Sequence, residues 1–104
     1  MPDTKAEANT KADRIREMLC EEGYEETVVF SNPDYADAFI GVTDRGGVAV
    51  YDYELMVESL VREGMSYEDA MDFIDYNTIG AYFGEKTPIV IHSLHFEKEQ
   101  RRNI

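Results

Sequence analysis

The segment Asp44-Arg45-Gly46-Gly47 constrains the fold more than any other part of this 104-residue chain. Two glycines after a polar pair favour a tight turn, because glycine readily adopts the backbone angles that hairpin turns require. Apolar and β-branched residues flank the turn, and they predict strands at 38–43 and 48–51. We therefore expect an antiparallel β-hairpin near the middle of the chain.

Two more segments are expected to be strands. Residues 25–31 read as a strand before the hairpin, since Val28 and Phe30 fall on one side and Thr27 and Val29 on the other. The continuous Ile-Val-Ile run at 89–91 indicates a strand that is buried on both faces. We expect the first three strands to form a meander and the last to join as a fourth.

Three segments have helical spacing of apolar residues. The first is 5–22, which Gly23 should end. The second, 53–63, should be capped by Asp52, and the third, 67–76, by Ser66. The order α-β-β-β-α-α-β predicts an α+β fold with a small antiparallel sheet covered on one face by helices. Residues 1–104 should form a single small acidic domain with loose ends at about 1–5 and 97–104.

The charge of the chain is concentrated in its middle. Twenty-two acidic and ten basic residues give a net charge of −12. Between Glu17 and Glu85 there are 17 acids and only the bases Arg45 and Arg62, a net charge of −15 for that stretch. Such a surface repels nucleic acid, whose binding needs clustered Lys and Arg, and it attracts basic proteins. Solubility alone is the simpler explanation of the same charge.

The location expected from the sequence is the cytoplasm. No apolar run is long enough to span a membrane, and no charged-then-apolar leader opens the chain. Cys20 is the only cysteine and cannot form an internal disulfide, which suits a reducing compartment. Free cysteine usually behaves as a small apolar residue, so Cys20 is not expected to be catalytic.

Residues 48–91 carry a resemblance to a known group. The matching segments are Val-Tyr-Asp-Tyr at 50–53, Gly-Met-Ser-Tyr-Glu at 64–68 and Tyr-Asn-Thr-Ile at 76–79. They resemble small uncharacterised acidic proteins of phages, prophages and conjugative elements of Gram-positive bacteria. That group commonly has Arg-Ala-Leu-Pro where this chain has Gly-Ala-Tyr-Phe at 80–83. The resemblance implies an origin in a mobile element and implies no chemistry.

Acidic residues at helical spacing are the candidate site. In 67–76, Glu68, Asp72 and Asp75 are four and three residues apart, so they should form one exposed stripe. Glu54 and Glu58 form a similar pair in the preceding helix. Such stripes can imitate a row of phosphates, although a solvated helix face has the same pattern. The candidate partner-binding residues are Glu54, Glu58, Glu68, Asp69, Asp72 and Asp75.

Other site chemistry is weakly supported by the sequence, and we expect no catalytic residue, metal or cofactor. Asn32, Asp34 and Asp37 resemble the start of a calcium loop, but the glycine and the bidentate acid of that loop are missing. His92 and His95 are three residues apart, which on a strand places them on opposite faces. A small hydrolase would need clustered acids in a pocket.

Two hypotheses for function follow. The first is a non-enzymatic module whose acidic face binds a basic protein surface, as in a mobile-element inhibitor of a host nucleic-acid-binding defence protein. The second is a structural or accessory protein that forms a homodimer through apolar and tyrosine surface, with the acids serving only solubility. Seven tyrosines in so short a chain are typical of a protein-binding surface.

Overall fold

The computed structural model describes residues 10–78, 81 and 84–94, and it confirms an α+β fold. The described part contains helices and a three-stranded sheet. Its elements, in chain order, are α2 (Lys11–Glu21), the 3-10 turn η1 (Ala36–Ala38), β1 (Phe39–Val42), β2 (Ala49–Asp52), α3 (Tyr53–Arg62), α4 (Tyr67–Phe73), the π-helical turn η2 (Ile74–Thr78) and β3 (Ile89–Ile91). The ends expected to be loose, 1–5 and 97–104, lie outside the described residues.

The sheet has the order β1-β2-β3 and is mixed. β1 and β2 form the expected antiparallel hairpin, and Gly46 and Gly47 have positive φ angles of 87° and 58° in its turn. The expectation of a wholly antiparallel sheet is wrong, because β3 pairs with β2 in parallel. The reason is the connection: α3, α4 and η2 carry the chain back along the molecule, so β3 enters the sheet in the same direction as β2.

The predicted strand at 25–31 is also wrong. This segment lies beside the core without joining the sheet, and the Phe30 N–H donates to the Tyr51 hydroxyl at 3.1 Å. A side chain therefore takes the place of a strand partner there. The next turn of the chain puts Tyr35 at a φ of 46°, an uncommon angle for a bulky residue, and it is held there by complete burial of the ring.

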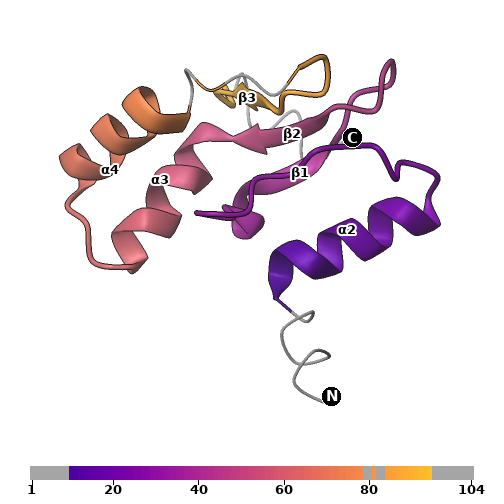
Figure 1. Ribbon diagram of the computed structural model, residues 1–104. Helices are drawn as coiled ribbons and strands as arrows, with labels where there is room; N and C mark the ends of the chain where they lie inside the picture. The colour runs from indigo at the N-terminus through magenta and orange to yellow at the C-terminus, as the bar shows by residue number, and fades with distance from the viewer. Residues whose placement is uncertain (1–9, 79–80, 82–83, 95–104) are drawn as a thin grey trace, which may run out of the picture.

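The core lies on the face of the sheet that carries Tyr51. Tyr51 packs against the rings of Phe30 and Phe39, with ring centroids 4.7 Å and 5.6 Å apart. Leu19 of α2 reaches the same cluster, so α2 covers this face (Figure 1). Figure 1 also shows α3 and α4 together at one end of the sheet, away from α2. The prediction that helices cover one face is thus confirmed for α2, while α3 and α4 pack at the end of the sheet and supply Met56, Leu60 and Ala70 to the same core.

The continuous Ile-Val-Ile strand is not buried on both faces, as its sequence predicts. Val90 packs against the core, whereas Ile89 and Ile91 are 41% and 38% exposed. Pairing of Val50 with Ile89 places both residues on the opposite face from Tyr51. Among the described residues, this second face of the sheet has no helix over it, so its isoleucines stay in contact with solvent.

Candidate protein-binding face

The helices α3 and α4 each follow a capping residue and begin with the sequence Tyr-Glu. Asp52 accepts from the Leu55 N–H at 3.1 Å and starts α3, and Ser66 accepts from the Asp69 N–H at 3.0 Å and starts α4. Both caps were predicted from the sequence. Because the caps set where each helix begins, they place Tyr53 and Tyr67 in equivalent first positions.

The two tyrosines bond to carboxylates of the neighbouring element. The Tyr53 hydroxyl donates to Asp75 Oδ1 at 3.0 Å, and the Tyr67 hydroxyl donates to Glu54 Oε2 at 3.0 Å. The bonds cross between α3 on one side and α4 with η2 on the other. They hold two acids from different helices at defined positions on one surface.

Two further acids lie close enough to act on these tyrosines. Burial raises the pKa of Tyr53 to about 12, with contributions from the Asp75 bond and from the charges of Asp75 and Asp72. The pKa of Tyr67 is raised by its bond to Glu54, and the charge of Glu58 adds to the effect. Negative charge nearby disfavours a phenolate, so these acids add to the rise in both pKa values.

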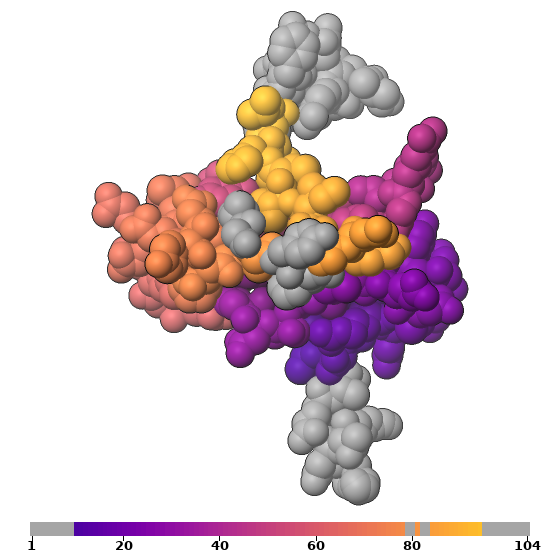
Figure 2. Space-filling model, turned by 45° about the horizontal axis from the view of Figure 1, so that its top comes forward, coloured from indigo at the N-terminus to yellow at the C-terminus, as the bar shows by residue number. Residues whose placement is uncertain are grey.

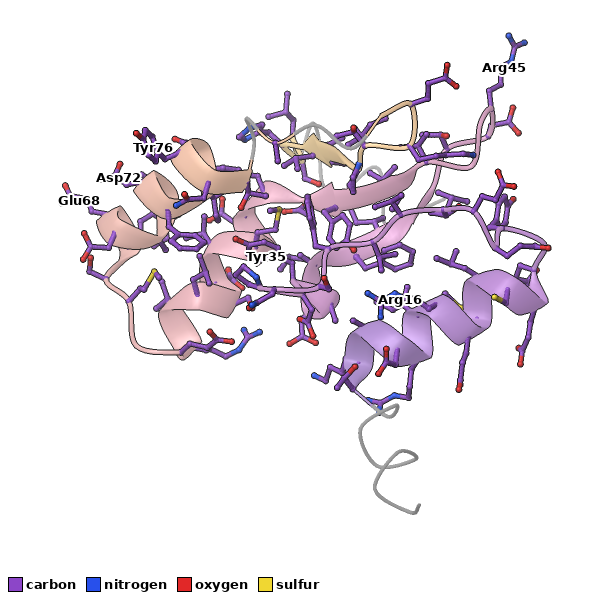
Figure 3. All side chains as sticks on the ribbon, in the orientation of Figure 1. Arg16, Tyr35, Arg45, Glu68, Asp72 and Tyr76 are labelled. Carbon is purple, nitrogen blue, oxygen red and sulfur yellow. The ribbon has the colours of Figure 1, made fainter. Side chains whose placement is uncertain are left out.

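Figure 3 shows Glu68 and Asp72 projecting from the same side of α4, away from the body of the molecule. The structure therefore brings together five of the six predicted acids and the two tyrosines. We call this surface the acidic face and define it by Tyr53, Glu54, Glu58, Tyr67, Glu68, Asp72 and Asp75.

Asp69 is the predicted residue that we leave out of this face, because the interactions given for Tyr53 and Tyr67 do not include it. It lies two positions after Tyr67, which is about 200° around the helix. Its backbone N–H bonds to Ser66, and its carboxylate has the usual place of an acid in the first turn. An acid near a helix N-terminus is favourable to the helix itself, so Asp69 needs no partner to explain it.

An open hollow of about 520 Å³ adjoins the acidic face. Glu54 and Glu58 line it together with Asp52, Leu55 and Ser93. Next to it, the centroid of the His92 ring lies 4.5 Å from the centroid of the Tyr53 ring. The residues after β3 thus form one wall of the hollow, which the sequence did not indicate.

The cations nearest in sequence pair elsewhere. Arg62 lies four residues after Glu58, a spacing that suits an ion pair on a helix. Its Nη2 instead lies 3.0 Å from Asp37 Oδ2, and Lys11 Nζ lies 2.9 Å from the other oxygen of Asp37. The third ion pair given for the described residues joins Arg16 to Asp13 within α2. None of these three pairs neutralises a carboxylate of the acidic face.

Tyr53 and Tyr67 are candidate residues of this face that the sequence pattern did not single out. Tyrosine content alone predicted a binding surface, but it did not say which tyrosines bond to acids. The repeated order cap-Tyr-Glu at 52–54 and 66–68 is the signal that could have identified them. His92 could have been placed only with the parallel pairing of β3 known.

The structure adds no support for the calcium-loop, histidine or cysteine candidates among the residues that it describes. Within the part of the chain that the structure describes, no three or more His, Cys, Asp or Glu side chains are grouped to hold a metal ion. Asp34 and Asp37 serve local structure, since Asp34 accepts from the Ala36 N–H and Asp37 bridges Lys11 and Arg62. His95 lies outside the described residues. Cys20 is a free, exposed cysteine of α2.

Comparison of the chain with protein families, with curated proteins and with solved structures found no match. None of the helices in the described ranges combines the length and apolar character that crossing a bilayer requires.

Proposed function

We propose that this chain is a non-enzymatic protein that binds a basic surface of a partner protein through the acidic face. The partner class that suits it best is a nucleic-acid-binding protein, because a groove lined with Lys and Arg for phosphates also attracts a group of fixed carboxylates. The resemblance of residues 48–91 to mobile-element proteins adds the finer proposal that the partner is a host defence protein.

The observation that supports the proposal most is the unbalanced charge of the helical end. Tyr53–Thr78 contains seven acids and one base, and that base, Arg62, pairs with Asp37. Like charges at helical spacing destabilise a helix, so such a surface has a cost in stability. Helix dipoles explain Glu54 and Glu68 in first turns, but they do not explain Glu58, Asp72 or Asp75.

The two tyrosine–carboxylate bonds also support a binding role. A binding surface with side chains held in place loses less conformational entropy when a partner arrives. Tyr67 is 50% exposed, so a partner that meets the acids also meets an aromatic ring. Tyrosine is enriched among the residues that dominate interface energies, and it adds contact area to what would otherwise be charge alone.

The test is capture of partner proteins by the immobilised chain, compared with two variants of equal charge. Glu54→Gln, Glu58→Gln, Asp72→Asn and Asp75→Asn together remove four charges from the acidic face. The matched control, Glu17→Gln with Glu21→Gln, Glu22→Gln and Glu25→Gln, removes four charges from α2 and the chain after it. We expect the first variant to lose the partner and the control to keep it.

Salt and nucleic acid make the test specific. Charge-driven association weakens as salt shortens the screening length from about 10 Å at 0.1 M to about 3 Å at 1 M. The captured partner should therefore elute with rising salt, and it should also be displaced by duplex DNA if the acidic face occupies its nucleic-acid groove. Equal losses from both variants, or capture that salt leaves unchanged, would overturn the proposal.

The alternative function is that of a structural or accessory homodimer, in which the acidic residues serve only solubility. It differs in one measurable respect, since a dimer that buries α3 and α4 would remove the acidic face from solvent. Tyr67 reports this, because its exposed ring should become protected from iodination in such a dimer and should stay reactive if the face is free.

A further inference from the structure

We propose that the outer edge of β3 is a self-association surface, at which β3 of a second copy of this chain pairs antiparallel with the first. The paired sheets would be continuous across the dimer, with three strands from each copy. This inference is independent of the acidic face, which lies on α3, α4 and η2 and would remain open in both copies.

The edge of β3 is open among the described residues. β3 is the last strand in the order β1-β2-β3, so one side of its backbone has no strand partner there. Figure 2 shows β3, in yellow, on the surface that faces the viewer. An unpaired edge presents backbone N–H and C=O groups that another strand can bond.

β3 lacks two of the devices that protect an edge, namely charged side chains and a bulge. β1, the opposite edge strand, is irregular, with a shift in register between Phe39 and Gly41. β3 carries no charge and no irregular pairing, and Ile89, Ile91 and Leu94 are 41%, 38% and 82% exposed. Its continuous apolar run is typical of a strand that is covered on both faces. The single copy covers one of them and leaves Ile89 and Ile91 exposed on the other, where side chains of a strand paired at the edge can contact them.

The distribution of charge favours a second copy in the antiparallel direction. Figure 3 shows Arg45 at one end of the molecule and Glu68 and Asp72 at the other. The hairpin tip and the start of β3 have two acids, Asp44 and Glu85, and two bases, Arg45 and Lys86, which cancel. The helical end has a net charge of −6, from seven acids and one base over Tyr53–Thr78. Antiparallel pairing sets the acidic end of each copy against the neutral end of the other, whereas parallel pairing would set the acidic ends together.

A register centred on Val90 pairs the apolar residues of the two β3 strands with one another. Val90 would then lie opposite Val90 of the second copy, and Ile89 opposite Ile91 of the second copy. These isoleucine pairs would lie on the face away from Tyr51, where each isoleucine gains an apolar cross-strand neighbour. A contact this short predicts a weak dimer, of the kind that buries less than about 1,200 Å² in total.

The experiment is sedimentation equilibrium of the full chain between about 10 μM and 1 mM, the range in which weak association becomes visible. We expect the average mass to rise toward twice the monomer value with concentration. Because each copy carries a net charge of −12, added salt should screen the repulsion and strengthen the dimer. That dependence is opposite to the one expected for the acidic face and its basic partner, so the two proposals can fail separately.

Ile91→Lys and Ile40→Lys form a matched pair of variants. Both add one positive charge to an exposed edge isoleucine, Ile91 on β3 and Ile40 on β1, where Ile40 is 51% exposed. The added charge lowers the net repulsion in both, so loss of the dimer in Ile91→Lys alone points to the edge of β3. Unfolding midpoints of the two variants, measured alongside, show that each remains folded.

Hydrogen exchange identifies the segment directly. In the wild type, the amides of residues 89–92 should gain protection as concentration rises, and in Ile91→Lys they should not. A monomer at every concentration and salt would overturn the proposal, as would equal loss of the dimer in Ile40→Lys. Edge amides that are already protected in dilute monomer would show that the chain covers its own edge, which would also overturn it.

Discussion

The hydroxyl of Tyr53 lies 3.0 Å from Asp75 Oδ1 and donates a hydrogen bond to it. Tyr53 is the first residue of α3, whereas Asp75 belongs to η2, 22 residues further along the chain. The Tyr67–Glu54 bond runs the other way, from the first residue of α4 to α3. Thus α3 donates one hydrogen bond from a phenol and accepts another at a carboxylate, and so does the pair α4 and η2 on the other side. The reciprocal arrangement fixes acids that a solvated helix would leave free to move.

This arrangement predicts loss of stability at alkaline pH. The pKa of Tyr53 is raised to about 12, and burial raises those of Tyr35 and Tyr51 above their ordinary value. A raised pKa contributes stability that is complete below the unfolded value of about 10 and is lost as pH rises through the folded value. The free energy of unfolding, measured with denaturant at several pH values, should therefore fall steadily above about pH 10.

Tyr53→Phe separates the contribution of Tyr53. Without the hydroxyl, one phenol should disappear from the ultraviolet titration near pH 12, and the alkaline fall in stability should become smaller. Tyr76→Phe is the control, since Tyr76 is 86% exposed. If both variants titrate and unfold alike, the Tyr53–Asp75 bond does not form as described.

Crowding of carboxylates on α3 predicts a stabilising charge removal. Glu54 and Glu58 are four residues apart on the acidic face, and such like-charged pairs destabilise a helix by about 0.2–0.5 kcal/mol. Glu58→Gln should raise the free energy of unfolding by that amount in low salt. Added salt should reduce the gain, because it already screens the repulsion. Glu26→Gln, at an exposed position outside the helices, is the control and should change stability less.

Much of the fold could be predicted because its signals are local. The Asp44–Gly47 turn, the Asp52 and Ser66 caps and the stop at Gly23 each depend on residues within one turn of chain, and the structure confirms them. The direction of β3 could not be predicted in this way, because it depends on how far α3, α4 and η2 carry the chain. The prediction of a strand at 25–31 was wrong for a related reason. Alternation shows that a segment suits a sheet, but it does not show whether a sheet edge is free to receive it.

The candidate site likewise has some features that the sequence predicts and others that depend on tertiary contacts. Helical spacing within α4 predicted that Glu68 and Asp72 share one side, and Figure 3 shows them there. Contact between α3 and α4 decides whether Glu54 joins Tyr67 and whether Tyr53 joins Asp75, and spacing carries no information about that. The pairing of Arg62 with Asp37 rather than Glu58 also required the tertiary structure.

The buried pair Tyr35 and Thr78 predicts non-additive substitutions. The Tyr35 hydroxyl and Thr78 Oγ1 are 3.1 Å apart, and the two residues are 1% and 9% exposed. Tyr35→Phe leaves the threonine hydroxyl buried without this partner, at a cost of about 1–3 kcal/mol, and Thr78→Val does the same to the phenol. The double variant should be less destabilised than the sum of the two, since it leaves no orphaned hydroxyl. Additive losses in denaturant unfolding would show that the two hydroxyls are not bonded.

Asp37 forms ion pairs with both Lys11 and Arg62, which predicts how it titrates in acid. The Lys11 ammonium, by its hydrogen bond and its charge, and then Arg62, hold the pKa of Asp37 below its ordinary value. A lowered pKa contributes stability that is present above the unfolded value of about 3.9 and is lost as pH falls through the folded value. Carboxyl chemical shifts, followed by NMR as acid is added, should show Asp37 titrating below that value.

Substituting Lys11 or Arg62 shows which cation lowers the pKa of Asp37 more. Substituting Asp37 shows whether Arg62 then pairs with another acid. Lys11→Met should raise the pKa of Asp37 more than Arg62→Met does, because the Lys11 contacts are the stronger cause. Asp37→Asn frees Arg62, and Glu58, four residues earlier on α3, is then its nearest helical partner. Capture of a basic partner by the acidic face should therefore weaken in Asp37→Asn, even though Asp37 lies outside the face. Unchanged capture, together with an unchanged environment of Glu58 by NMR, would show that Arg62 does not respond to the loss of Asp37.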